Sequence, residues 1–211
     1  IPIESDMDCL VREVDAPMVV ITGTNGKSTV TFLLGEMAKA AGLHVAVAGN
    51  IGIPVLDCFA SSDAFDVWVL EVSSFQLELT NTLSPRVAAF LNISPDHLDR
   101  HEHEQAYLAA KQRVYRRAEV CLFNRDNPET YPDSDNLKQG SRIVSYGEDA
   151  PESEAWGLRS DAKGSCWLAY GDELILPVKA LLIEGIHNAL NALAALALAE
   201  ELGLPRDSSL Q

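Results

Sequence analysis

The residues with the most evident chemistry form a short glycine-containing segment that follows an apolar, β-branched stretch at 18–22. In order they are Gly23, Thr24, Asn25, Gly26, Lys27, Ser28 and Thr29. Glycines let backbone N–H groups converge on phosphate oxygens, and a lysine at the start of a helix adds a full positive charge. A hydroxyl at Ser28 or Thr29 can ligate Mg²⁺. The segment predicts a phosphate-binding loop, although two residues rather than the usual four separate its glycines; the alternative is an ordinary strand-to-helix turn with a solvated lysine.

Two further strand ends carry charged or titratable side chains. Glu71 ends the almost wholly apolar run 66–71, where an ionised carboxylate is costly unless a cation such as Mg²⁺ pairs with it. The alternative is a glutamate that has already reached solvent. His97 follows the apolar run 87–92, where it can bind a second cation, orient a phosphate, or serve the structure alone.

Lys111 is unusual because it falls on a helical face that is otherwise apolar. Tyr107, Lys111, Val114 and Ala118 follow one another at offsets of four, three and four, so they share one stripe. A buried ammonium group can extend to solvent or pair with an acid. It can also lose its proton and become open to covalent modification, because burial disfavours the charged form.

Polar residues also mark the ends of other apolar segments. Asn50 follows the strand-like run 44–48, and Ser73 comes directly after the run that ends at Glu71, where it can cap the next helix or contact a ligand. Asn188 and Asn191 lie three apart at the start of an apolar helix, so their amides share one face. These amides can bind an adenine edge or simply cap the helix.

Short apolar runs alternate with helical patterns over about the first 125 residues, which predicts βαβ units. We expect strands at 18–22, 44–48, 66–71, 87–92 and 119–123, helices at 28–41, 103–118 and 186–202, and a small antiparallel sheet that includes 142–146, 166–170 and 173–176. The expected fold class is α/β, with a mainly parallel sheet of P-loop type, helices on both faces and a small antiparallel subsheet. The phosphate loop, Asn50, Glu71 and His97 would then meet at the carboxyl edge of the sheet, where such folds bind ligands.

The amino-acid composition limits which partners the protein can bind and in which compartment it is expected. The 211 residues carry 16 Lys and Arg against 31 Asp and Glu, a net charge of −15, which disfavours duplex nucleic acid and anionic membranes as partners. The four cysteines are dispersed without a C-x-x-C pair, and no apolar run reaches the roughly 18 to 20 residues of a membrane span. We expect a monomer in the cytoplasm that binds neither nucleic acid nor membrane.

Several motifs resemble those of the Mur ligases, the ATP-dependent amide ligases that build the stem peptide of peptidoglycan. The loop 23–29 is similar to their shortened phosphate loop, and His187-Asn188 followed by Asn191 is similar to the start of their nucleotide-contacting helix. The run 71–78 is most similar to the version in the members that add D-glutamate. Other members, and the related folylpolyglutamate synthetases, differ after that glutamate. The matches extend from about residue 1 to 211.

The resemblance implies roles for the residues that would contact ATP and metal. Lys27 would hold the β- and γ-phosphates of ATP and act in catalysis. Ser28 or Thr29 would hold one Mg²⁺ together with Glu71, and His97 would hold a second Mg²⁺.

The resemblance also implies roles around the acceptor and the adenine. Lys111 matches the family lysine that CO₂ carbamylates, a change that turns a cation into an anion able to orient Mg²⁺. Asn50 and Ser73 would face the acceptor substrate, and Asn188 and Asn191 the adenine side of the nucleotide.

The implied reaction transfers the γ-phosphoryl group of ATP to the alanine carboxylate of UDP-N-acetylmuramoyl-L-alanine, and the amine of D-glutamate then attacks the acyl phosphate. The family has three domains. Residues 1–204 would be the central ATP-binding domain and 205–211 the start of a linker to a C-terminal domain, so the piece alone should form little product. The rivals are a generic phosphotransferase, a non-catalytic nucleotide-binding module, and another Mur ligase or folylpolyglutamate synthetase relative.

Overall fold

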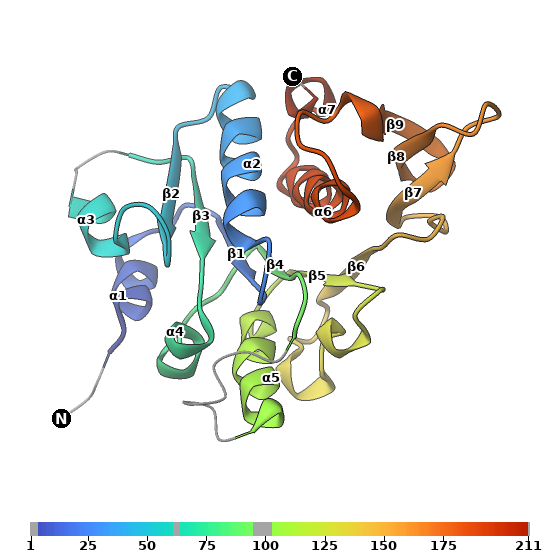
Figure 1. The fold of residues 1–211 in the computed structure, drawn as a ribbon. Coiled ribbons are helices and arrows are strands. Elements are labelled where there is room, and N and C mark those ends of the chain that lie inside the picture. Colours follow the sequence, from blue (N-terminus) through green and yellow to red (C-terminus); the bar gives the residue numbers. More distant parts are fainter. Residues whose placement is uncertain (1–3, 61–63, 95–102, 211) are drawn as a thin grey trace.

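The computed structural model describes residues 4–60, 64–94 and 103–210, in which helices cover both faces of a nine-stranded sheet (Figure 1). The helices are α1 (Asp6–Glu13), α2 (Lys27–Ala40), α3 (Val55–Ala60), α4 (Ser74–Leu79), α5 (Glu104–Gln112), α6 (Ile186–Leu202) and α7 (Arg206–Ser209). The strands are β1 (Met18–Thr22), β2 (Val45–Gly49), β3 (Val67–Glu71), β4 (Val87–Phe90), β5 (Val120–Asn124), β6 (Arg142–Tyr146), β7 (Trp156–Ser160), β8 (Cys166–Tyr170) and β9 (Glu173–Pro177). The predicted metal ligand His97 lies outside the described residues.

The sheet has a parallel part and an antiparallel part. Its strand order is β2-β3-β1-β4-β5-β6-β7-β8-β9, and neighbours from β2 to β6 run parallel. Strands β7, β8 and β9 form an antiparallel meander, which joins the parallel part through the single residue pair Tyr146–Trp156. The predicted fold class is confirmed.

One detail of the prediction was wrong. The segment 142–146, expected in the antiparallel sheet, is β6 and pairs in parallel with β5, whereas the antiparallel partners of β8 are β7 and β9. The side chains of β6 alternate in burial, and alternation identifies a strand with one covered face without giving the direction of its neighbour.

Side chains of the central strand alternate between two cores. Val19 and Ile21 of β1 face one core with α2 and α6, whereas Met18 and Val20 face the other core with α1 and α3. Figure 1 shows α2 and α6 beside each other, away from α1 and α3. Because both faces are covered, β1 is buried over its whole length and is apolar except for Thr22.

Within the segment 205–211, which was expected to begin a linker, residues 206–209 form the short helix α7, which packs near α2. Arg206 pairs with Glu200 of α6 and with Glu173 of β9. This arginine therefore ties the end of the chain to the antiparallel part of the sheet.

The strand register brings several carboxyl ends to one edge. Ile21 and Gly49 both lie beside Glu71, and Thr22 lies beside Phe90. The residues that follow β1, β2, β3 and β4 therefore meet at this edge. Within the described ranges, none of the helices has the length and apolar character needed to cross a membrane.

Candidate active site

The segment after β1 forms a compact loop whose two glycines are required by their surroundings. Gly26 has φ +78° and starts α2, and a Cβ at this position would lie 2.4 Å from Oδ1 of Asn191. At Gly23 a Cβ would lie 3.2 Å from the Cβ of Leu91, the residue that follows β4. No side chain caps α2, so its first N–H groups point from the loop as donors suited to an anion.

Lys27 lies at the start of α2 and is partly buried. Its Nζ donates to the carbonyl oxygen of Thr24 at 3.0 Å, which places the ammonium group directly over the loop. Together with the helix N-terminus, this lysine makes a positive site in a chain of strongly negative net charge.

Glu71, at the end of β3, is buried with 2% of its surface exposed. Its Oε2 accepts a hydrogen bond from Oγ of Ser28 at 2.9 Å, and its Oε1 accepts one from Nδ2 of Asn50 at 3.2 Å. Both donors are neutral, and an ionised carboxylate in such a setting gains from a nearby cation. Of the two predicted hydroxyls, Ser28 is the one that contacts Glu71, and Thr29 follows it in α2.

The donor set at Glu71 fits Mg²⁺. A carboxylate oxygen and a serine oxygen are hard ligands, and Mg²⁺ is usually held by one or two carboxylates together with substrate phosphates and water. Among the residues that the structure describes, no three His, Cys, Asp or Glu side chains form a metal-binding group of their own. The site therefore suits a metal that arrives with phosphates rather than one held in a closed protein cage.

Lys111 lies in α5 and is 2% exposed, which confirms that it belongs to the buried face predicted from the sequence. Its Nζ donates to the carbonyl oxygen of Gly23 at 2.7 Å and to Oγ1 of Thr22 at 3.4 Å. It also lies 4.8 Å from the ring centroid of Tyr107. The lysine thus extends from α5 to the start of the phosphate loop instead of to solvent.

A cavity of about 210 Å³ opens between the phosphate loop, α4 and α5. The predicted residues that line it are Gly23, Thr24, Lys27, Asn50, Ser73 and Lys111. Ser73 also caps α4, since its Oγ accepts from the N–H of Gln76 at 3.3 Å. Ser73 therefore both caps α4 and lines the cavity, so its two predicted roles, helix capping and ligand contact, are compatible.

A second cavity, of about 450 Å³, lies on the other side of the loop. Asn25, Gly26 and Asn191 line it, together with His187 and Leu190 of α6. The side chain of Asn188 instead donates to the carbonyl oxygen of Glu184 at 2.7 Å, at the start of the helix. The predicted pair of asparagines is thus divided between the cavity and the helix end.

Sequence reasoning missed three residues near the loop. Asn92 and Tyr146 line the larger cavity, and the hydroxyl of Tyr107 lies 3.2 Å from Oγ1 of Thr24. The available signal for Asn92 was that it ends the apolar run 87–92, as Glu71 ends the run 66–71.

These features define a class. The chain is a P-loop type α/β domain, with a loop and a helix N-terminus suited to phosphate between two cavities. It belongs to the Mur ligase middle domain family, whose model matches residues 21–199.

Sequence relatives agree with this assignment. The chain is 55% identical over 202 residues to a UDP-N-acetylmuramoylalanine--D-glutamate ligase of Legionella pneumophila (strain Lens), with 96% of this chain and 45% of the relative covered. It is 46% identical over 212 residues to the enzyme of that name from Escherichia coli (strain K12), with 100% of this chain and 46% of the relative covered. The chain spans about half the length of the curated relatives it matches.

Solved structures support the fold. A UDP-N-acetylmuramoyl-L-alanyl-D-glutamate--2,6-diaminopimelate ligase superposes with a TM-score of 0.77 at 21% identity, with 97% of this chain and 47% of that chain covered. A pseudomurein peptide ligase type C from Methanothermus fervidus superposes with a TM-score of 0.67 at 24% identity, with 96% of this chain and 50% of that chain covered.

Proposed function

We propose that this chain is the central ATP-binding domain of a ligase that adds D-glutamate to UDP-N-acetylmuramoyl-L-alanine. The names of the relatives at 55% and 46% identity support the reaction and its substrates. The observation that carries the proposal within the chain is the 2.9 Å contact between Ser28 and Glu71, directly beside Lys27. This contact joins a hydroxyl of the phosphate loop to a buried carboxylate from another strand.

The proposed mechanism begins with the phosphates of ATP on the loop. Backbone N–H groups at the start of α2 and the ammonium group of Lys27 would hold and orient the β- and γ-phosphates. Ser28 and Glu71 would hold a Mg²⁺ ion, and His97 is proposed for a second one. A bound Mg²⁺ draws negative charge from the phosphate oxygens during transfer.

Phosphoryl transfer and amide formation would then follow in two steps. An oxygen of the alanine carboxylate forms a bond to the γ-phosphorus, and the bond from that phosphorus to the β-phosphate oxygen breaks, which releases ADP. The amine of D-glutamate next attacks the acyl carbon, and inorganic phosphate leaves as the amide forms. Asn50 and Ser73, which line the smaller cavity, would orient the acceptor.

Lys111 is proposed as a carbamylation site. The ammonium group of Lys111 would first lose one proton. The neutral Nζ would then form a bond to the carbon of CO₂ as one C–O π bond opens, and a second proton would leave the nitrogen, so that an anion replaces a cation at the cavity. A native mass spectrum at neutral pH should show the added mass of one CO₂ in the intact protein and none in Lys111→Ala. An unmodified spectrum in bicarbonate buffer would remove this part of the proposal.

Acetate rescue offers a second test of Lys111. In Lys111→Ala of the full-length protein, added acetate or another small carboxylate should restore part of the lost turnover, because it can supply the missing anion. A lysine that acts only through packing predicts no rescue by any carboxylate.

The decisive experiment for the reaction is the substrate dependence of phosphate release. In the full-length protein with Mg²⁺ and ATP, phosphate should appear only when both UDP-N-acetylmuramoyl-L-alanine and D-glutamate are present, and Lys27→Ala should abolish it. Release with a different acceptor would favour a generic phosphotransferase. Nucleotide binding without release under any condition would favour a non-catalytic module.

Domain organisation and location follow from the same proposal. Residues 1–204 would form the middle domain and 205–211 would lead toward a further domain, so the chain alone should bind nucleotide weakly and form little product. Equal ligation by residues 1–211 and by the full-length protein would contradict this. We propose a monomer in the cytoplasm, to be checked by sedimentation and by fractionation.

A further inference from the structure

The loop that follows β4 holds the phosphate loop through one asparagine. Oδ1 of Asn92 accepts hydrogen bonds from the N–H groups of Asn25 at 2.8 Å and Thr24 at 3.1 Å. Its Nδ2 donates to the carbonyl oxygen of Asn25 at 2.9 Å. The backbone oxygen of Asn92 also accepts from the N–H of Thr24 at 2.9 Å. The side chain of Asn92 therefore accepts from two N–H groups of the loop and donates to one of its carbonyl oxygens.

A second residue of the same segment reinforces this contact. The N–H of Ser94 donates to Oγ1 of Thr24 at 3.1 Å. The close approach of Gly23 to Leu91, where a Cβ would crowd the neighbouring strand, shows that the two segments are packed together. The phosphate loop is thus fixed along its first half from one side.

The segment after β4 is itself anchored to the next strands. The carbonyl oxygen of Leu91 accepts from Nδ2 of Asn124 and from the hydroxyl of Tyr146, each at 3.0 Å. The N–H of Ile93 donates to Oδ1 of Asn127 at 2.5 Å. Neutral side chains from the ends of β5 and β6 and from the loop after β5 therefore hold the residues that flank Asn92.

We propose that Asn92 is a positioning residue for the nucleotide, an inference that rests on the proposed use of ATP. Asn92 accepts from the amides of Thr24 and Asn25, so these two donors are already occupied. The donors left for phosphate are the N–H groups from Gly26 to Thr29 and the ammonium group of Lys27. By fixing the first half of the loop, Asn92 sets the direction of the second half.

The chemistry of the side chain explains why an asparagine stands here. The position needs an acceptor for two N–H groups and a donor for a carbonyl oxygen on one planar group, which an amide supplies. An aspartate in place of Asn92 would accept but not donate, and its charge would repel both the Asn25 carbonyl and a bound polyphosphate. Alanine would supply neither bond and leave the loop less ordered.

The test compares Asn92→Ala and Asn92→Asp with Asn136→Ala in the full-length protein. Asn136 accepts a hydrogen bond from Arg116 away from the loop, so it controls for the loss of an asparagine. We expect Asn92→Ala to weaken binding of a non-hydrolysable ATP analogue with Mg²⁺ about tenfold and to raise KM for ATP similarly. The KM values for the acceptor and for D-glutamate should stay within twofold, as should all constants of Asn136→Ala.

Asn92→Asp adds a readout that a purely structural role would not move. Its affinity for the analogue should fall further at low ionic strength, because a carboxylate beside phosphates repels them and salt screens the repulsion. Thermal unfolding of each variant shows whether the protein remains folded.

The outcomes separate this inference from the proposed function. Wild-type protein that does not bind the analogue would refute the use of ATP itself. Wild-type binding with an unchanged affinity in both Asn92 variants would overturn the positioning role alone. A uniform change in every KM would also overturn it, because it would indicate a general loss of structure.

Discussion

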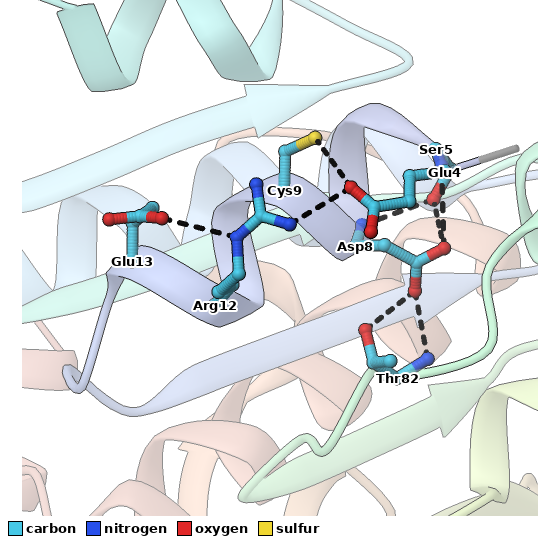
Figure 2. Close-up of polar contacts among 7 residues, drawn as sticks. All are labelled: Glu4, Ser5, Asp8, Cys9, Arg12, Glu13 and Thr82. Atoms are coloured by element: carbon cyan, nitrogen blue, oxygen red, sulfur yellow. Dashed lines mark hydrogen bonds and ion pairs between the residues drawn. The ribbon is translucent and has the colours of Figure 1, made fainter. Parts of the chain in front are cut away.

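Among the residues that the structure describes, two carboxylates are buried, Asp8 and Glu71, and their surroundings are very different. Asp8 lies in the first turn of α1 and is 8% exposed. Figure 2 shows Asp8 between Ser5 of the same helix start and Thr82 of the loop after α4. One of its oxygens accepts three hydrogen bonds, from the N–H of Asn81, the N–H of Thr82 and Oγ1 of Thr82. The other oxygen accepts from the N–H and the hydroxyl of Ser5.

The difference lies in how far the protein alone satisfies each charge. Burial by itself raises the pKa of Asp8, but the hydrogen bonds from Thr82, Asn81 and Ser5 outweigh it and lower the pKa to about 2. Glu71 accepts from one hydroxyl and one amide, beside a loop suited to phosphate. A carboxylate enclosed by protein donors joins elements of the fold, whereas one with fewer donors at a strand end is available to a ligand.

Of the substitutions that test this contrast, Glu71→Gln should have the largest effect. The substitution keeps the shape of the side chain but removes the charge that a metal needs, so turnover with MgATP in the full-length protein should fall about 10²- to 10³-fold. Urea unfolding of residues 1–211 should show unchanged or higher stability, because a costly buried charge is lost. Turnover within a few-fold of the wild type would show that Glu71 belongs with Asp8 as a structural carboxylate.

Asp8→Asn is the reciprocal substitution. An amide nitrogen in place of one oxygen cannot accept from the N–H and hydroxyl of Ser5, so two donors lose their acceptor. We expect the free energy of unfolding to fall by about 2–3 kcal/mol, and KM for ATP to stay within twofold. A larger effect on KM than on stability would reverse the assignment of the two carboxylates.

Sequence reasoning found Glu71 and missed Asp8, for a physical reason. Glu71 ends an apolar strand, and a charge at the end of a buried strand is visible as a break in hydrophobicity. Asp8 stands three residues after Ser5 in a helix start that resembles many solvent-exposed ones, and its other partner is 74 residues away. Its burial arises from tertiary contact, which no local pattern encodes.

The same reasoning explains which other features could be predicted. The burial of Lys111 could be predicted because it shares a helical stripe with Tyr107 and Val114. Its hydrogen bond to the carbonyl oxygen of Gly23 could not be predicted, since this bond depends on how α5 lies against the loop. The parallel direction of the central strands follows from βαβ connections, but their order does not, because β3 lies between β1 and β2. The direction of β6 relative to β5 depends on the loop between them. Contacts between residues of different elements are therefore what the structure adds.

Acid unfolding tests the lowered pKa of Asp8. Because its pKa is lowered from 3.8 to about 2 in the folded state, its stabilising contribution is present above pH 3.8 and is lost as the pH falls through about 2. The shift corresponds to about 2 kcal/mol. In urea unfolding of residues 1–211, the free energy of unfolding should fall between pH 5 and pH 2. This fall should be smaller by about 2 kcal/mol in Asp8→Asn than in the wild type. Equal acid sensitivity of the two proteins would contradict the lowered pKa.

The smallest effects should come from the hydroxyl groups that donate to the two carboxylates. Ser5 and Ser28 both donate through Oγ, at 3.0 Å to Asp8 and at 2.9 Å to Glu71, so removal of each hydroxyl tests the same kind of bond in the two settings. Ser5→Ala also removes the N-cap of α1, and it should lower the free energy of unfolding by about 1 kcal/mol without a change in KM for ATP.

Ser28→Ala should do the opposite. Loss of a proposed metal ligand should raise KM for MgATP about tenfold and leave urea unfolding within about 0.5 kcal/mol of the wild type. The hydroxyl of Ser28 bonds to a carboxylate that would still accept from Asn50, so the folded state loses little. Equal losses of stability in Ser5→Ala and Ser28→Ala, with ATP kinetics unaffected in both, would mean that Glu71 and Asp8 are satisfied in the same way and that Glu71 is not available to a metal.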